Sequence, residues 1–382
     1  MIPLSIPNIS GNELKYVKDC IETGWISSAG EYVNKFEDAI KHYTGAKYAI
    51  ACINGTAGIQ VSLNLAGVTK DDIVIAPNLT FVATLNAISY TSAQPILIDV
   101  CEDSWQIDVD LLEEWLIENT TTVMIQGNPV TKEKLSGKKI GAILPVCVLG
   151  GFVNIDKLLK ISISYGIPII EDSTEALGSF KKGKHAGTFG LTGVLSFNGN
   201  KIISTGGGGM ILTNNEDIAI RAKHITTTAK TDPLDYFHDE VGYNYRLVNV
   251  LAAIGVGQME NFEQILKRKK EIDAFYKKEL NGIGDIKFQI NDPNTNPNCW
   301  LFTFRTSRMR DLLNYLNSKQ IQSRPFWTPM NKLPMYKDLI YINKNDISNK
   351  IFQYCISIPS SSNLNISDQQ KVVNEIKNFY KI

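Results

Sequence analysis

The sequence lacks several features that would assign it to other classes of protein. It has no excess of charge, since its 39 Lys and Arg residues are matched by 39 Asp and Glu residues, which argues against binding driven by a nucleic-acid backbone. It has no apolar run of about 18 residues, the length that a membrane helix needs, and its first residues lack a basic segment followed by an apolar one. We therefore expect no membrane span, no signal peptide and a cytoplasmic location.

Patterns for metal, redox and dinucleotide sites are also missing. The six cysteines contain no CxxC pair, and the four histidines show no HExxH or HxH spacing, so we expect no zinc ribbon, no thioredoxin-like site and no bound metal. The cysteines are expected to be reduced and mostly buried. No GxGxxG loop follows the first predicted strand, which weakens a dehydrogenase interpretation.

Short apolar segments alternate with amphipathic ones through the first two-thirds of the chain. The apolar segments predict strands that are buried on both faces, and the amphipathic segments predict helices. This alternation indicates an α/β protein with a mostly parallel sheet flanked by helices. The strands are expected at 48–52, 73–76, 96–100, 140–148 and 167–171, and the helices at 56–67, 81–90, 108–116 and 155–165.

The pattern changes after about residue 196. Two strand-like segments, 193–197 and 209–213, are separated by a glycine-rich loop, and a long helical region follows from 248 to 280 with a bend near Asn261. A Gly, Asn and Pro-rich stretch then leads into a smaller α+β unit. We expect an N-terminal arm (1–14), a large domain (15–260) and a small C-terminal domain (261–382).

Ligand sites of parallel α/β sheets gather at the C-terminal ends of strands. Four features of this sequence fall at such ends. Asn54-Gly55-Thr56 follows the first strand and opens a helix, where free amides and the helix dipole favour an anion. Phe81, after the second strand, offers a face for a planar ring. Taken alone, the first motif is also typical of a helix N-cap that binds no ligand. An aromatic residue such as Phe81, taken alone, is also typical of core packing.

Two further strand ends carry charged residues. Glu171-Asp172 follows four apolar residues, so a carboxylate there is partly desolvated and needs a cation or donors; it could also cap the next loop. Lys201 lies between an apolar strand and four consecutive glycines, a setting in which a lysine can lose its proton and act as nucleophile and base. A phosphate cradle, a carboxylate, an aromatic face and a lysine together indicate pyridoxal 5′-phosphate.

The same segments resemble the DegT/DnrJ/StrS-type nucleotide-sugar aminotransferases, which have the fold-type I architecture of aspartate aminotransferase. The resemblance covers nearly the whole chain, from IPLSIPNISGNELKY through NGTAGIQVSL and IIEDSTEALG to SRPFWTPM. SFNGNK, GGGGM, HITTTAK and RPFWTPM are most similar to the branch of the bacillosamine and legionaminic acid pathways.

The resemblance implies roles for individual residues. Lys201 forms the imine link to pyridoxal 5′-phosphate, and Asp172 pairs with the pyridine nitrogen. The remaining cofactor contacts are the phosphate site at Gly55, Thr56 and Ser196, the phenolic oxygen near Glu175, the ring face at Phe81, and Asn198 in the lysine loop.

Other implied roles concern the substrates and a partner subunit. Asn244 would reach the phosphate of the neighbouring subunit, so the enzyme would be a homodimer with shared active sites. Arg246 is a candidate for the carboxylate of the amino donor, and Trp327 for a wall of the sugar-nucleotide site. The family often has HLYG where this chain has Cys147 to Gly150, which leaves the role of that loop open, and Gln where it has Glu175.

The reaction that the resemblance implies transfers an amino group from L-glutamate to C4 of a nucleotide-linked 4-keto-6-deoxy sugar, with pyridoxamine 5′-phosphate as intermediate. The expected substrate is UDP-2-acetamido-2,6-dideoxy-hexos-4-ulose, in lipopolysaccharide or O-antigen biosynthesis, with the amine of the product axial or equatorial. Relatives in which His replaces the lysine are dehydratases, and the presence of Lys201 favours transamination. The alternatives are a dehydratase-like reaction on a dTDP- or GDP-linked sugar and a catalytically silent regulatory protein.

Overall fold

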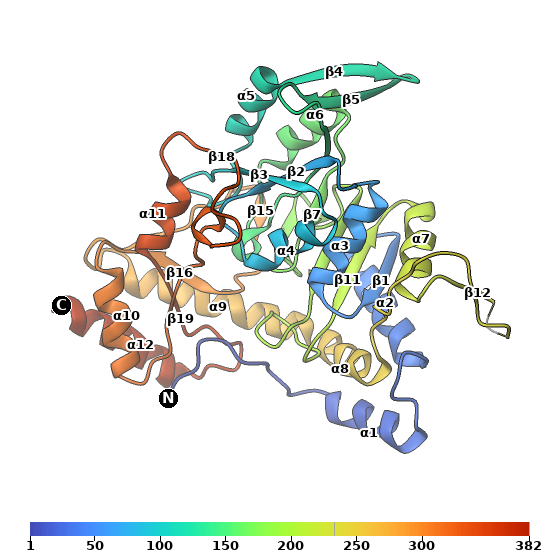
Figure 1. The fold of residues 1–382 in the computed structure, drawn as a ribbon. Coiled ribbons are helices and arrows are strands. Elements are labelled where there is room, and N and C mark those ends of the chain that lie inside the picture. Colours follow the sequence, from blue (N-terminus) through green and yellow to red (C-terminus); the bar gives the residue numbers. More distant parts are fainter. Residues whose placement is uncertain (233, 382) are drawn as a thin grey trace.

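The computed structural model describes residues 1–232 and 234–381, and it confirms the predicted α/β class (Figure 1). Its large sheet has the strand order β18-β3-β2-β6-β7-β10-β11-β1. The contact between β6 and β7 consists of two parallel bridges, Ile143 with Ile169 and Val146 with Asp172. Every neighbouring pair is parallel except those of β11, which runs antiparallel to β1 and β10. The strands are β1 (Tyr48–Cys52), β2 (Asp72–Pro77), β3 (Gln94–Ile98), β6 (Lys139–Ile143), β7 (Ile170–Asp172), β10 (Thr192–Ser196), β11 (Gly209–Thr213) and β18 (Tyr341–Ile342).

Helices cover both faces of this sheet because its strands are apolar on both sides. In β11, Met210 and Leu212 pack into one core and Ile211 into another, as the two-residue period of a strand requires. Residues of α2 and α8 belong to the first core, and residues of α3 and α7 to the second. The helices of this part are α1 (Glu13–Thr23), α2 (Glu31–Thr44), α3 (Gly55–Leu65), α4 (Val82–Tyr90), α5 (Val109–Asn119), α6 (Ile155–Tyr165), α7 (Glu216–Thr226) and α8 (Asn249–Glu260).

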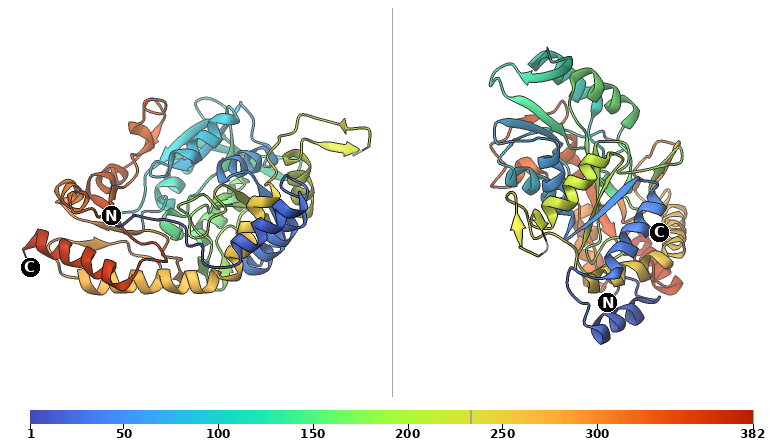
Figure 2. Two further views of the ribbon diagram at one scale, coloured as in Figure 1. Left: turned by 90° about the horizontal axis from the view of Figure 1, so that it is seen from below. Right: turned by 90° about the vertical axis from the view of Figure 1, so that its right-hand side faces the viewer.

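The C-terminal part has its own antiparallel sheet, with the order β14-β16-β19-β17. Its core also includes Ile2 from the N-terminal arm. The long helix α9 leads from the large sheet toward this part, with α12 packed beside it (Figure 2). The elements are α9 (Phe262–Leu280), β14 (Lys287–Phe288), β16 (Phe302–Arg305), α10 (Met309–Ser318), β17 (Arg324–Pro325), α11 (Ile347–Tyr354), β19 (Cys355–Ile358) and α12 (Ile366–Tyr380).

The predicted bend near Asn261 is confirmed, since α8 ends at Glu260 and α9 begins at Phe262. The division into 1–14, 15–260 and 261–382 stays a prediction. The C-terminal part contributes β18, which pairs in parallel with β3, so it also returns to the large sheet.

Several elements were not expected from the sequence. The hairpin of β4 (Thr120–Ile125) and β5 (Asn128–Glu133) extends the large sheet beyond β6, and the hairpin of β12 (Lys230–Asp232) and β13 (Phe237–His238) stands away from the body (Figure 2). Helix α7 was missed as well. A small sheet is formed by β8 (Phe180–Lys181), β9 (Lys184–His185) and β15 (Thr295–Asn296), and 3-10 turns lie at Val148–Gly150 and Met330–Lys332.

The structure also bears on two of the composition arguments. All six cysteines are free and four of them are buried, as predicted. In the part of the chain that the structure describes, no helix is both long and apolar enough to cross a membrane.

Candidate active site

A cavity of about 460 Å³ opens at the C-terminal ends of β7 and β10, in front of the N-terminus of α3. Residues of the C-terminal part close its other side. It brings together most of the residues that were singled out in the sequence, because parallel strands end at one edge of their sheet. The predicted site residues that line it are Gly55, Thr56, Phe81, Asp172, Glu175, Ser196, Asn198, Lys201 and Trp327.

The N-terminus of α3 forms the anion-binding side of the cavity. The Asn54 side chain caps the helix by accepting a 2.8 Å hydrogen bond from the Ala57 amide. The amides of Gly55 and Thr56 lie in the first turn, where no intrahelical acceptor exists. A Cβ atom at Gly55 would lie 3.0 Å from Thr174 Cγ2 and 3.1 Å from Ser196 Cβ, so glycine keeps this corner open. The corner therefore offers backbone amides, two hydroxyls and the positive end of a helix dipole to an anion.

Asp172 provides the carboxylate of the site. It ends β7, is only 3% exposed, and lines the cavity. Its Oδ2 accepts a 2.7 Å hydrogen bond from the Thr84 hydroxyl, and its Oδ1 accepts a 3.2 Å bond from the Thr174 amide. Thr84 is in turn 2.7 Å from the hydroxyl of Thr80. The carboxylate is thus fixed in orientation, with room for one cationic partner in the cavity.

Lys201 lies in the loop between β10 and β11. Its side chain is 12% exposed, and its Nζ lies 3.9 Å from Glu175 Oε1. Burial lowers the pKa of this amine, and the charges of Glu175 and Asp172 raise it. The glycines beyond it allow a close passage of the backbone, since a Cβ atom at Gly209 would lie 2.6 Å from the carbonyl carbon of Asn54. The loop therefore places one partly desolvated amine beside the Glu175 carboxyl group, and the effect of burial prevails, so that the pKa of the amine is lowered.

The loop from Cys147 to Gly150, whose role the sequence left open, holds Glu175. The Leu149 amide donates a 2.7 Å hydrogen bond to Glu175 Oε2, and Leu149 adopts a positive φ of 55° to present it. Burial raises the pKa of Glu175 to about 7, against the opposing effects of Lys201 and the Leu149 amide. This carboxyl group can therefore gain or lose a proton near neutral pH.

Aromatic side chains form one wall of the cavity. The ring centroids of Phe81 and Trp327 are 6.3 Å apart, and those of Trp300 and Trp327 are 6.4 Å apart. Phe81 is 52% exposed, so its ring is free to cover a ligand from one side. Such a wall suits a flat or partly apolar ligand.

The lining residues that sequence reasoning missed include Thr84, Trp300 and Arg324. Thr84 lies in the first turn of α4 and Trp300 precedes a short strand, and neither position has a distinctive motif. Arg324 lies beside Trp327 in the segment RPFWTPM, which carried part of the resemblance, so that segment was the available signal.

Asn244 and Arg246 do not line the cavity. They lie in a segment that crosses from the end of α7 to β1, where Asn244 bridges Thr227 and Arg246 bridges Cys52. Asn244 is exposed, and the Nε atom of Arg246 is buried without a hydrogen-bond partner among the described residues. Within one subunit, therefore, neither residue is placed where it could contact a ligand in the cavity, and their predicted roles stay predictions.

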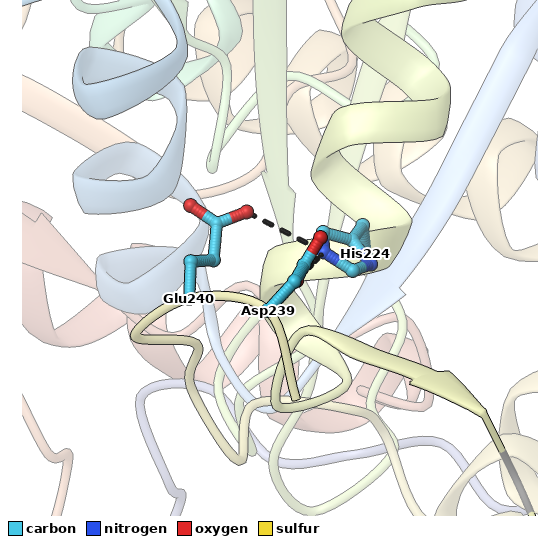
Figure 3. Close-up of side chains that lie close together, drawn as sticks. All are labelled: His224, Asp239 and Glu240. Carbon is cyan, nitrogen blue, oxygen red and sulfur yellow. Dashed lines mark hydrogen bonds and ion pairs between the residues drawn. The ribbon is translucent and has the colours of Figure 1, made fainter. Parts of the chain in front are cut away.

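One further cluster of ionisable side chains lies away from the cavity. His224 of α7 approaches Asp239 at 2.8 Å and Glu240 at 3.4 Å, with the ligand atoms of all three within 4.8 Å of one another (Figure 3). The Arg221 guanidinium pairs with both oxygens of Glu240. Because a cation already neutralises that carboxylate, the cluster is explained as an ion-pair network that ties the segment before Asn244 to α7.

The residues of the cavity fit pyridoxal 5′-phosphate. The α3 N-terminus with Gly55, Thr56 and Ser196 suits a phosphate group, Asp172 suits a protonated ring nitrogen, and Lys201 suits an aldehyde carbon. Two donors orient Asp172 at the cavity, where a ring nitrogen could meet it, and the corner at Gly55 leaves space for a phosphate group beside the α3 amides.

Comparisons with known proteins agree with this chemistry. Residues 7–377 match the model of the DegT/DnrJ/EryC1/StrS aminotransferase family. The chain is 33% identical over 385 residues to a putative pyridoxal phosphate-dependent aminotransferase EpsN of Bacillus subtilis (strain 168), covering 99% of this chain and 96% of that protein. It is 33% identical over 382 residues to a GDP-perosamine synthase of Escherichia coli O157:H7, covering 99% and 98%. A crystal structure of a DegT DnrJ EryC1 StrS aminotransferase from Brucella abortus has the same fold, with a TM-score of 0.89, 23% identity and coverage of 97% and 96%.

Proposed function

Because the chain belongs to the DegT/DnrJ/EryC1/StrS aminotransferase family, and is thus a pyridoxal phosphate-dependent enzyme, we propose that it transfers the amino group of L-glutamate to C4 of a nucleotide-linked 4-keto-6-deoxy sugar. The observation that carries the proposal is the meeting of Lys201, Asp172 and the α3 N-terminus around one cavity. That set of groups is what an amino transfer through this cofactor requires.

Each residue then has a definite task. Lys201 would hold the cofactor through a covalent link, and its amine, when free, would move a proton to or from the substrate carbon. Asp172 keeps the ring nitrogen protonated, and Thr84 holds the Asp172 carboxylate in place. Gly55, Thr56 and Ser196 bind the phosphate. When bound, the cofactor supplies an aldehyde carbon and an electron-accepting ring.

Arg324 is the guanidinium that lines the cavity, and we assign it to an anionic group of the substrates. One of its nitrogens donates to the Ser323 carbonyl at 3.2 Å. The other N–H groups of its planar guanidinium remain available as donors, and their geometry suits a carboxylate or a phosphate. Arg246 remains the alternative for the carboxylate of glutamate, should it enter the site from a partner subunit.

The nucleotide of the sugar has two candidates. The motifs SFNGNK and RPFWTPM resemble the branch that uses UDP-linked sugars, whereas the relatives in Escherichia coli O157:H7 and Vibrio cholerae are named GDP-perosamine synthases. We keep the UDP-linked 2-acetamido sugar as the proposed substrate and a GDP-linked 4-keto sugar as the second candidate.

We also propose a homodimer in which Asn244 completes the phosphate site of the partner. Three large apolar side chains near Asn244 are strongly exposed, namely Trp25 (58%), Ile26 (53%) and Ile53 (42%). Backbone hydrogen bonds join their segments to 245–250. Exposed apolar side chains that lie together are typical of an interaction surface, and the segments of these three adjoin the segment that contains Asn244.

Three experiments test the proposed function. Incubation with glutamate alone should convert the cofactor's absorbance to that of the pyridoxamine form, whereas a dehydratase-like enzyme would leave it unchanged. Borohydride followed by mass spectrometry should place the adduct on Lys201, and a regulatory protein with a silent site would show none. Lys201→Ala should abolish turnover without loss of the fold.

The choice of nucleotide needs a separate assay. Glutamate should be offered with a panel of UDP-, dTDP- and GDP-linked 4-keto sugars, and the amino sugar formed should be identified by mass spectrometry and NMR. Amination of the UDP-linked 2-acetamido sugar at the highest kcat/KM supports the first candidate. Preference for the GDP-linked sugar replaces it by the second.

A further inference from the structure

Lys201 and Trp300 come from distant parts of the chain and meet at the cavity. The Lys201 Nζ lies 4.2 Å from the centroid of the Trp300 ring, and Trp300 is only 3% exposed. An ammonium group over the face of an indole is attracted by the ring's quadrupole, and the attraction grows when water is excluded. A neutral amine gains much less from the same contact. The contact therefore favours the protonated form of Lys201.

The indole ring is held in this position by hydrogen bonds to the elements that carry the active site. Its Nε1 donates a 2.7 Å hydrogen bond to the carbonyl of Asn200, the residue before Lys201. The backbone amide of Trp300 donates a 3.1 Å hydrogen bond to the Asn298 side chain. The Asn298 side chain in turn donates to the carbonyl of Glu175 at 2.7 Å. Trp300 is thus tied to the loop of Lys201 and to the turn of Glu175.

Two carboxyl groups also act on the Lys201 amine. Glu175 Oε1 lies at 3.9 Å, and Asp172 acts on the amine through its charge. Asp172 is already directed toward the ring nitrogen in the proposed function, and the Glu175 carboxyl group titrates near neutrality. The indole ring has no titratable group, so its effect on the amine does not change with pH.

We propose that Trp300 is a positioning residue that receives the Lys201 side chain each time its amine has taken up a proton. This inference rests on the proposed amino transfer. In that reaction a C–H bond of the bound substrate breaks, its electron pair stays with the substrate, and an N–H bond forms on Lys201 Nζ. The ammonium that results is largely buried, and the indole face stabilises it until the proton is returned to the substrate.

The test measures the protonation of Lys201 directly, in the full chain freed of cofactor by treatment with hydroxylamine. Competitive labelling with acetic anhydride over a range of pH, read by mass spectrometry of the Lys201 peptide, gives the midpoint at which the amine loses its proton. Trp300→Leu should lower this midpoint by about one pH unit. Trp300→Phe keeps a ring and should shift it in the same direction by less.

Trp327→Leu is the matched control, because Trp327 lines the same cavity and its ring centroid lies 6.4 Å from that of Trp300. It should leave the Lys201 midpoint unchanged. Circular dichroism checks that each variant is folded, and Trp300→Phe alone decides the matter if Trp300→Leu does not fold. An unchanged midpoint in a folded Trp300 variant, or an equal shift in Trp327→Leu, overturns the proposal. Neither result touches the proposed function, which fails on a different observation, the absence of a borohydride adduct at Lys201.

Discussion

The hydroxyl of Thr84 donates a 2.7 Å hydrogen bond to Asp172 Oδ2, and both side chains are almost completely buried. The bond joins the first turn of α4 to the end of β7, and it fixes the carboxylate that the proposed function directs at the cofactor ring. A hydrogen bond to a charged group is worth about 1.5–3 kcal/mol.

Thr84→Val should therefore slow the reaction with glutamate roughly ten- to a hundredfold while leaving the fold intact. Valine has the same shape but cannot donate, so the Asp172 carboxylate loses its orientation. Thr84→Ser, which keeps the hydroxyl, should retain most of the rate. Stopped-flow measurement of the cofactor's absorbance after mixing with glutamate gives the comparison. Equal rates for the valine and serine variants would show that the bond has no catalytic role.

Glu171 and Asp172 are neighbours in sequence, yet the structure gives them opposite surroundings. Successive residues of a strand point to opposite faces, so only Asp172 lines the cavity. The Glu171 carboxylate instead accepts hydrogen bonds from the amides of Gly187 (2.8 Å), Phe189 (2.7 Å) and Gly190 (2.7 Å). Its role is to hold the loop before β10.

The two amide variants should therefore separate stability from catalysis. Glu171→Gln should lower the free energy of unfolding by about 2 kcal/mol or more, since buried amides lose a charged acceptor. Asp172→Asn should leave the thermal midpoint nearly unchanged and slow the glutamate reaction on the order of a hundredfold or more. Calorimetry and stopped-flow absorbance measure the two effects. A large rate loss in folded Glu171→Gln would contradict this separation.

Much of the site was predictable because its residues stand at strand ends. Gly55, Asp172 and Lys201 each follow an apolar segment that reads as a strand, and the geometry of parallel sheets brings such ends together. The position of Trp300 was not predictable in this way. It reaches the cavity only because the C-terminal part packs over the edge of the large sheet, and no local pattern encodes that packing.

The missed secondary structure has local causes. The turn between β4 and β5 has positive φ angles at Gln126 (51°) and Gly127 (80°). This is a two-residue hairpin turn whose first residue is not one of the usual types. Helix α7 did carry a signal, since Asn215 caps it and Glu216 and Asp217 lie in its first turn. Its 11 residues equal those of α5 and α6, which were predicted, so α7 was predictable from these signals.

The raised pKa of Glu175 predicts a dependence of stability on pH in the cofactor-free protein. With a pKa of about 7 when folded and an ordinary value of 4.5 when unfolded, the folded state holds more protons between these two values. Stability from this group is therefore present in full below pH 4.5 and declines as the pH rises to about 7. The decline is on the order of 3 kcal/mol.

Glu175→Gln removes this titration. Its free energy of unfolding, measured by urea denaturation at several pH values, should decline less than that of the natural protein between pH 4.5 and 7. The glutamine can still accept the hydrogen bond from the Leu149 amide, so the loop from Cys147 to Gly150 should keep its conformation. Parallel pH curves for the two proteins would show that the Glu175 carboxyl group is ionised throughout this range.

The proposed sharing of the active site predicts that two defective variants restore each other. Lys201→Ala removes the reactive amine, and Asn244→Ala removes the side chain that we assign to the partner's phosphate site. In a hybrid dimer, one site then combines the intact Lys201 of one subunit with the intact Asn244 of the other, while the second site lacks both. Mixing the variants, followed by unfolding and refolding together to exchange subunits, should therefore give more activity than the sum of the separate variants.

The matched control pairs Lys201→Ala with Asp172→Asn, two residues that line the same cavity of one chain, and it should give no such gain. Restoration in both mixtures, or in neither, would mean that Asn244 does not act across the subunit boundary.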